Sequence, residues 1–123
     1  GLLVVGVPCP RSWDARLFGP AWLGWDAPRH LYVFPEDTLR AILEGTGYQV
    51  IATRCFYGGS GSLFTSLDYV LQERFGESRL GWLLRWVIGL RPWRYLFWPY
   101  FRLAEWAGQG PIRAYFCRPV PSC

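Results

Sequence analysis

Apolar residues near the start of the chain change from a continuous run to helical spacing, and this change predicts a strand followed by a helix. Residues 1–7 are all aliphatic or glycine and are followed by proline, which is typical of a short strand buried on both faces of a covered sheet. Further along, Leu39, Ile42 and Leu43 are spaced to share one helix face. We therefore predict a helix over 35–45, whose first turn carries acidic residues at the positive end of the helix dipole.

Two more β-favouring runs predict strands at 48–56 and 112–119. The first of them follows the helix directly, so the order strand, helix, strand outlines an α/β unit. Residues 11–34, between the first strand and the helix, are rich in aromatic residues, glycine and proline and have no clear period. We interpret them as a long loop, and loops of this length in compact domains tend to be functional.

Residues 57–110 differ in character and predict a helical insertion. Apolar residues recur near helical spacing over 63–75, and 80–106 is dense in tryptophan, leucine, tyrosine and arginine. The longest charge-free piece, 95–101, is far shorter than the roughly 20 apolar residues that a membrane-spanning helix needs. Three interpretations stay open for 80–106: a lid that covers a lipid-like substrate and touches the membrane, a plain helical cap, or a dimer contact.

The composition narrows the classes of function. The chain has 123 residues, enough for one small domain, and 19% of them are aromatic. A core of this size has difficulty burying so many rings, so we expect some to face a partner, a lipid or another part of the protein. The net charge of +4 comes from scattered arginines, and this pattern does not indicate a nucleic-acid partner.

The cysteines and the single histidine indicate whether the protein binds a metal and in which cellular compartment it lies. Four cysteines without a C-x-x-C pair and one histidine exclude the common spacings of zinc sites, and we predict no metal. The cysteines are too widely spaced for a disulfide framework, so we read them as reduced thiols of a cytoplasmic protein. The aromatic segment 80–106 adds the expectation of peripheral contact with the inner face of the membrane.

Three short stretches together resemble a known family. They are WDAPRHLYVF at 25–34, Thr38-Leu39, and LEGTGYQV at 43–50. They are similar to the post-catalytic half of the class I S-adenosylmethionine-dependent methyltransferases, in the broad group of quinone-biosynthesis O-methyltransferases and sugar or lipid methylases. Members of that group often show a strand ending in proline, then an aromatic loop with a histidine shortly before phenylalanine. A leucine-rich helix and a glycine-aromatic pair before the next strand usually follow.

The resemblance implies a fold. Residues 1–8 look like the fifth strand of the family's sheet, 49–56 like the sixth, and 112–119 like the seventh, which pairs antiparallel with its neighbours at the sheet edge. The implied fold class is α/β: a partial Rossmann-like methyltransferase sheet, strands five to seven with one crossover helix, plus an α-helical aromatic insertion. The implied parts are the methyltransferase core at 1–56 and 111–120 and the insertion or lid at 57–110.

The resemblance also implies a cofactor and a function. The cofactor is S-adenosylmethionine, which the family holds mainly in its N-terminal half, with a glycine-rich loop after the first strand and an acid ending the second. Neither feature can be placed here, so we expect a fragment that is inactive without that half. The expected methyl acceptor is an apolar or lipid-like small molecule. The alternative is a non-catalytic, membrane-interfacial binding module.

His30 is the predicted catalytic residue. It has the one side chain in the sequence whose ordinary pKa suits proton transfer near neutrality. It can act as a base or an orienting group beside the methyl acceptor. It can also be a structural histidine that holds its loop, because methyl transfer often needs only alignment of the acceptor with the sulfonium.

Five neighbours of His30 are the predicted substrate-binding residues. Arg29 has a planar fork that can bind a carboxylate or phosphate of the acceptor, or it can form a surface ion pair with Asp26. Trp22 and Trp25 can wall an apolar pocket or form the small core of the loop itself. Tyr32 completes the predicted acceptor loop.

Overall fold

The computed structural model of the protein describes residues 1–26, 30–57 and 61–120. In chain order the elements are β1 (Leu3–Pro8), α1 (Trp13–Phe18), two 3-10 turns (Gly19–Ala21 and Leu23–Trp25), α2 (Glu36–Gly45), β2 (Tyr48–Phe56), α3 (Gly61–Phe75), α4 (Arg79–Ile88), α5 (Pro92–Leu96), α6 (Trp98–Trp106) and β3 (Ile112–Pro119). The chain is a mixed α/β protein. The helix predicted at 35–45 and the strands predicted at 48–56 and 112–119 are confirmed.

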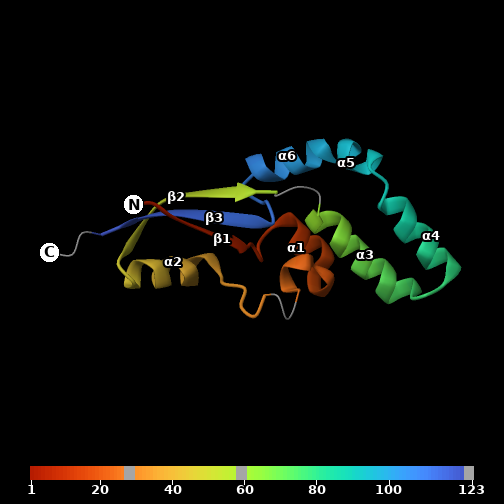
Figure 1. Ribbon diagram of the computed structural model, residues 1–123, viewed down its shortest axis with the longest axis horizontal. Helices are drawn as coiled ribbons and strands as arrows, with labels where there is room; N and C mark the ends of the chain where they lie inside the picture. Colours follow the sequence, from red (N-terminus) through yellow and green to blue (C-terminus); the bar gives the residue numbers. More distant parts are fainter. Residues whose placement is uncertain (27–29, 58–60, 121–123) are drawn as a thin grey trace.

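The three strands form one small sheet in the order β1-β3-β2 (Figure 1). The central strand β3 pairs antiparallel with both neighbours, with Val5 opposite Tyr115 and Val50 opposite Cys117. The predicted antiparallel pairing of the last strand is therefore confirmed. Its predicted place at the sheet edge is wrong, because β3 pairs on both sides and lies between β1 and β2. Because β1 and β2 both oppose β3, they run parallel to each other, and the connection between them passes through α2.

One face of the sheet carries the first hydrophobic core. Leu39 and Leu43 of α2 pack against Tyr115 and Cys117 of β3, and the inward side chains of β1 close this core. The prediction that β1 is buried on both faces is wrong, because Val4 points the other way and is 51% exposed. The reason is that α2 covers one face only. Strand alternation then leaves every second residue of β1 outside that core.

The prediction of one long loop over 11–34 is also wrong, because α1 forms at its start. Ser12 caps this helix: its Oγ accepts a hydrogen bond from the Ala15 N–H at 3.2 Å. Asp14 lies in the first turn, where the helix dipole favours an acid. A six-residue helix is too short to show a hydrophobic period, which is why the pattern along the sequence does not reveal it.

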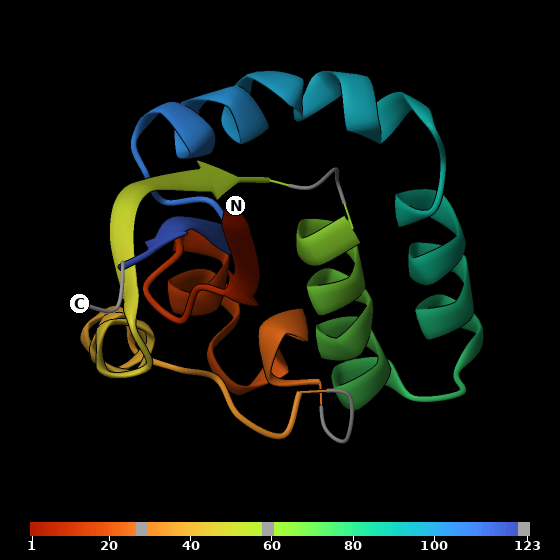
Figure 2. The same ribbon diagram turned by 60° about the vertical axis from the view of Figure 1, so that its left-hand side comes forward.

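The segment 57–110 holds the remaining helices. Figure 2 shows α3 beside α4, with α5 and α6 continuing along the rim of the molecule above β2. The second core lies here, where Tyr57, Leu63, Phe101 and Ala104 are buried together. No helix in the described part of the chain is both long enough and apolar enough to cross a membrane.

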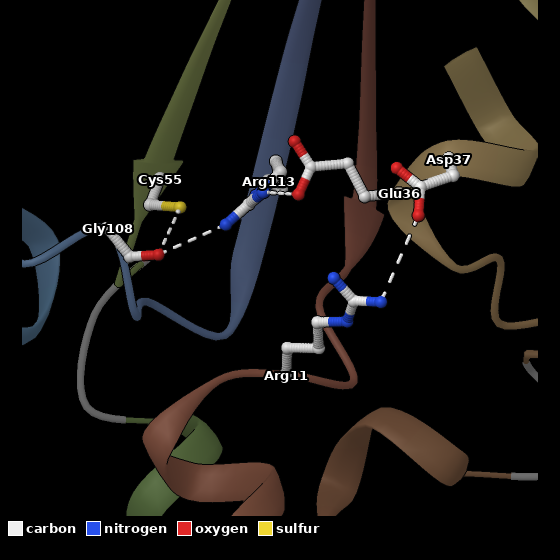
Figure 3. A network of polar contacts seen from close by, with 6 residues as sticks. All are labelled: Arg11, Glu36, Asp37, Cys55, Gly108 and Arg113. Atoms are coloured by element: carbon white, nitrogen blue, oxygen red, sulfur yellow. Dashed lines mark hydrogen bonds and ion pairs between the residues drawn. The ribbon is translucent and has the colours of Figure 1, made fainter.

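Arg113 lies at the start of β3 and links this end of the sheet to α2. Its side chain leaves the central strand, pairs with Glu36 in the first turn of α2, and donates to the Gly108 carbonyl at 3.1 Å (Figure 3). The Cys55 thiol contacts the same carbonyl at 3.1 Å. Cys55 is a free thiol on β2, the strand that pairs with β3. Arg113 thus connects β3 to α2 and to the loop after α6, and Cys55 of β2 contacts the same loop.

Candidate functional site

A pocket of about 340 Å³ lies where β1 ends. Its walls come from the end of β1, the turn after α1, the beginnings of α3 and β3, and two single residues, His30 and Tyr57. Tyr57 directly follows β2, so the pocket lies at the end of the sheet where β1 and β2 finish and β3 begins. The lining is mostly apolar, and its polar side chains are His30, Tyr57 and Ser62.

Trp22 forms the rigid wall of this pocket. It is 2% exposed, and its indole Nε1 donates to Ser62 Oγ at 3.3 Å. Trp25 packs edge-on against it, with ring centroids 5.4 Å apart, and donates from Nε1 to the Gly19 carbonyl at 3.1 Å. Trp25 supports the wall from behind and does not line the pocket. Trp22 is thus a buried residue that lines the pocket, whereas Trp25 is 44% exposed and only packs against it.

The Gly24→Ala substitution tests how closely this wall is fitted. A methyl group at position 24 would lie 2.2 Å from the Trp22 ring, so the ring or the turn must move. We expect a loss of about 2 kcal/mol in the free energy of unfolding, typical of overpacking. Urea unfolding followed by circular dichroism measures it. The matched control is Gly45→Ala in α2, where nothing lies within 4 Å of the new methyl group. Equal stability of the two variants contradicts the fitted wall.

Beneath the pocket lies a buried carboxylate between two tyrosines. Asp14 is 1% exposed and accepts hydrogen bonds from the Tyr57 hydroxyl at 2.7 and 2.6 Å and from the Tyr100 hydroxyl at 2.8 Å. The Tyr57 backbone N–H donates to Glu105 Oε1 at 2.8 Å, so main chain and side chain of Tyr57 are both held. These contacts join α1, the end of β2 and α6 under the pocket.

Burial raises the pKa of Tyr57 far above its ordinary value, and the hydrogen bond to Asp14 raises it further. The same causes, in the same order, raise the pKa of Tyr100. Both phenols therefore stay protonated at neutral pH and remain donors to Asp14. The Tyr57 ring lines the pocket, while its hydroxyl donates its hydrogen bond to the Asp14 carboxylate.

His30 lies at the mouth of the pocket. Its side chain is exposed, and its backbone N–H donates to the Asp26 carbonyl at 3.0 Å. Within the described residues no hydrogen bond occupies the imidazole, so both ring nitrogens can reach a ligand. Asp26 is partly buried. Arg29 lies outside the described residues, and so does its predicted ion pair with Asp26.

Tyr32 lies away from this pocket. It is 76% exposed and stacks on Phe34 with ring centroids 6.0 Å apart. The structure thus brings His30 and Trp22 into one pocket, holds Trp25 against Trp22, and places Tyr32 outside the lining.

Sequence reasoning missed Tyr57 and Asp14. A signal existed for Tyr57, because a residue just after a parallel strand lies at the ligand-binding edge of a sheet. For Asp14 the signal was weaker, namely a serine N-cap two residues earlier. Their contact joins positions 43 residues apart, and no local pattern predicts it.

A second hollow lies between α1, α3 and the start of the α5–α6 rim. It has a volume of about 520 Å³. Its lining is entirely apolar and consists of Leu17, Phe18, Leu63, Phe64, Leu67, Val70, Ile88, Trp93 and Phe97. The first residues of α3 line the first pocket and later residues line the second, so the two hollows share this helix.

The pocket does not fit S-adenosylmethionine as its main binding site. The ribose hydroxyls and the amino-acid group of that cofactor need polar and charged partners, yet the described residues of the pocket lining include no carboxylate. Nor do the described residues contain three His, Cys, Asp or Glu side chains grouped to hold a metal ion. The lining suits an apolar ligand with few polar atoms.

Comparison of the chain with protein families, with curated proteins and with solved structures finds no match.

Proposed function

We propose that this chain forms the acceptor side of an S-adenosylmethionine-dependent methyltransferase. Its acceptor is an apolar or lipid-like small molecule, and the cofactor is held mainly by an N-terminal half that this sequence does not contain. The observation that carries the proposal is the apolar pocket at the carboxyl ends of β1 and β2, which contains His30 and Trp22. These two residues belong to the predicted acceptor loop.

The strand arrangement supports the proposed family. β1 and β2 run parallel, are connected through α2, and have the antiparallel β3 between them. The antiparallel pairing of β3 with its neighbours agrees with what the resemblance implies for the seventh strand of a Rossmann-like methyltransferase sheet. Among the described residues the outer edge of β1 is unpaired, so further strands of such a sheet could continue from it.

The walls of the pocket support an apolar acceptor. Trp22 and Tyr57 present ring surface, and Ser62 and His30 supply the few polar atoms that would orient a hydroxyl. The fully apolar hollow along α3 offers space for a hydrocarbon tail. An aromatic or quinol-like head with a long tail fits both.

The residues of this chain would bind and orient the acceptor and exclude water. The exposed imidazole of His30 is the group that can accept a proton from an acceptor hydroxyl at the pocket mouth. Tyr57 cannot take this role, because its hydroxyl stays protonated and donates its hydrogen bond to the buried Asp14. The methyl group itself would come from the cofactor bound elsewhere.

The test is methyl transfer by the complete gene product. The protein is incubated with methyl-tritiated S-adenosylmethionine and a polyprenyl-substituted catechol, and label is counted in the organic phase. We expect labelled organic product, and we expect His30→Ala to lower turnover about a hundredfold, as for loss of a positioned acid or base. Leu31→Ala, an exposed neighbour outside the pocket, is the matched control.

Two results would overturn the proposal. The first is a folded gene product that transfers no label to the catechol or to a chloroform extract of cell membranes. The non-catalytic membrane-interfacial module would then be the better account of the chain. The second is transfer to water-soluble material alone, which would reject the apolar acceptor. Equal turnover of His30→Ala and Leu31→Ala would assign His30 a structural role.

A further inference from the structure

We propose that the outer surface of α4–α6 binds the face of an anionic lipid membrane. This outer surface is defined by its exposed large apolar side chains, Trp82, Leu83, Trp86, Tyr95, Leu96, Trp98, Leu103 and Trp106. The inference goes beyond the proposed function and does not depend on it, since a membrane-bound chain need not be an enzyme.

The α5–α6 segment is apolar on both sides. Its inner side packs into the second core through Phe101 and Ala104, which are buried. Its outer side carries Tyr95 at 81% exposure and Trp106 at 85%, with Trp98 between them. Large aromatic side chains that stay exposed beside a packed core indicate a surface that contacts a partner.

The side chains of this surface are of the kinds that lie in a membrane interface. Tryptophan and tyrosine combine an apolar ring with a polar tip, and they concentrate where lipid tails meet headgroups. The leucines add apolar area on the same helices. Each of the three helices is short, with 10 residues in α4, 5 in α5 and 9 in α6, so they suit a position along the surface of a bilayer.

The positive charge of residues 79–104 favours an anionic partner. Residues 79–104 contain five arginines and no aspartate or glutamate. Arg85 pairs with Asp68, and Arg102 with Glu105. Arg91 precedes α5 and Arg94 lies within it. Among the described residues no carboxylate lies within ion-pair distance of either, so both can bind headgroup phosphates. Arginines beside exposed tryptophans are typical of surface-bound helices on anionic lipid.

The helices of this segment lie at the periphery of the molecule. Figure 2 shows α6 and α5 following one another across the top, above β2, and α4 turning down the side beside α3. An interfacial surface formed by a rim can contact a bilayer while the pocket beside β1 stays open to its own ligand.

Vesicle co-sedimentation tests the proposal. This chain, and the complete gene product, are centrifuged with vesicles of phosphatidylcholine alone or mixed with phosphatidylglycerol. We expect pelleting with the mixed vesicles that weakens as salt is added. The Arg91→Gln/Arg94→Gln variant should lower the partition coefficient for mixed vesicles by about tenfold, since each arginine near an anionic surface contributes severalfold. Tyr95→Ala/Trp106→Ala should lower it for the same vesicles.

Matched controls come from exposed residues elsewhere. Arg118→Gln removes an exposed arginine from β3, and Leu31→Ala removes an exposed apolar side chain from the loop before α2. Both should bind like the parent, and circular dichroism verifies that all variants are folded. Equal pelleting with and without phosphatidylglycerol, or variants that bind as well as their controls, would overturn the proposal.

Two further outcomes would identify a different partner and also overturn it. Analytical ultracentrifugation without lipid reveals a stable dimer if a second copy covers the surface, and Tyr95→Ala/Trp106→Ala would then dissociate it. A complete gene product that does not bind vesicles, while this chain does, would show that the rest of the protein covers the surface.

Discussion

Replacing Asp14 by alanine should lower the free energy of unfolding by about 3 kcal/mol, because two buried tyrosine hydroxyls then lose their acceptor. Tyr57 and Tyr100 both donate to this carboxylate at 2.8 Å or less. The Asp14→Asn variant keeps one acceptor oxygen and should lose less. Urea unfolding followed by circular dichroism measures both changes.

The control for this prediction is Asp37→Ala. Asp37 also lies in the first turn of a helix, but its side chain is exposed and its ion pair with Arg11 is 4.0 Å long. We expect a change of less than about 1 kcal/mol there. A similar loss in the two variants would mean that the buried network contributes little.

A double-mutant cycle separates the network from simple helix effects. In a protein that already carries Tyr57→Phe and Tyr100→Phe, no donor is left unpaired when Asp14 is replaced by alanine. The further loss should then be well below the loss in the parent protein, and the difference measures the coupling. Additive losses would contradict the proposed coupling.

Replacing Arg113 by alanine should lower the free energy of unfolding by about 2 kcal/mol. The substitution removes the ion pair with Glu36 and the hydrogen bond to the Gly108 carbonyl (Figure 3). Both partners are only partly exposed, so water replaces the lost contacts incompletely. The loss should be accompanied by faster hydrogen exchange in the first turns of α2, which the ion pair holds against β3.

Two variants test whether this loss of stability comes from the two contacts of the Arg113 side chain. Arg113→Lys keeps the charge but cannot hold two partners with one planar fork, so its stability should lie between those of the parent and the alanine variant. Arg118→Ala, on the same strand but exposed, should change stability by less than about 0.5 kcal/mol. Equal losses in Arg113→Ala and Arg118→Ala would reject the bridging role of Arg113.

Most of the regular elements were predictable because their signals are local. The run at 48–56 is β-favouring throughout, and the spacing of Leu39 and Leu43 matches a helix with one buried face. The exception, α1, has too few residues to show a period. The exposure of Val4 was not predictable either, because an apolar run looks the same whether one or both faces of its strand are covered.

The candidate site was predictable only in part. His30 and Trp22 stood out as chemically distinct residues of one segment, and the structure places both in the same pocket. Tyr57 and Ser62 belong to other segments and reach that pocket through the packing of β2 and α3. Whether Tyr32 points into a pocket or to solvent depends on the path of its loop, which residue type does not specify.

The sequence alone determined where β2, β3 and α2 form and where the aromatic and basic residues are concentrated, since these depend on neighbours along the chain. The tertiary structure alone decided that β3 lies between β1 and β2, that Asp14 lies under Tyr57, and that Tyr95 and Trp106 remain exposed. Each of these depends on contacts between distant positions. Such contacts form only where packing compensates for the entropy lost in closing the long loops between them.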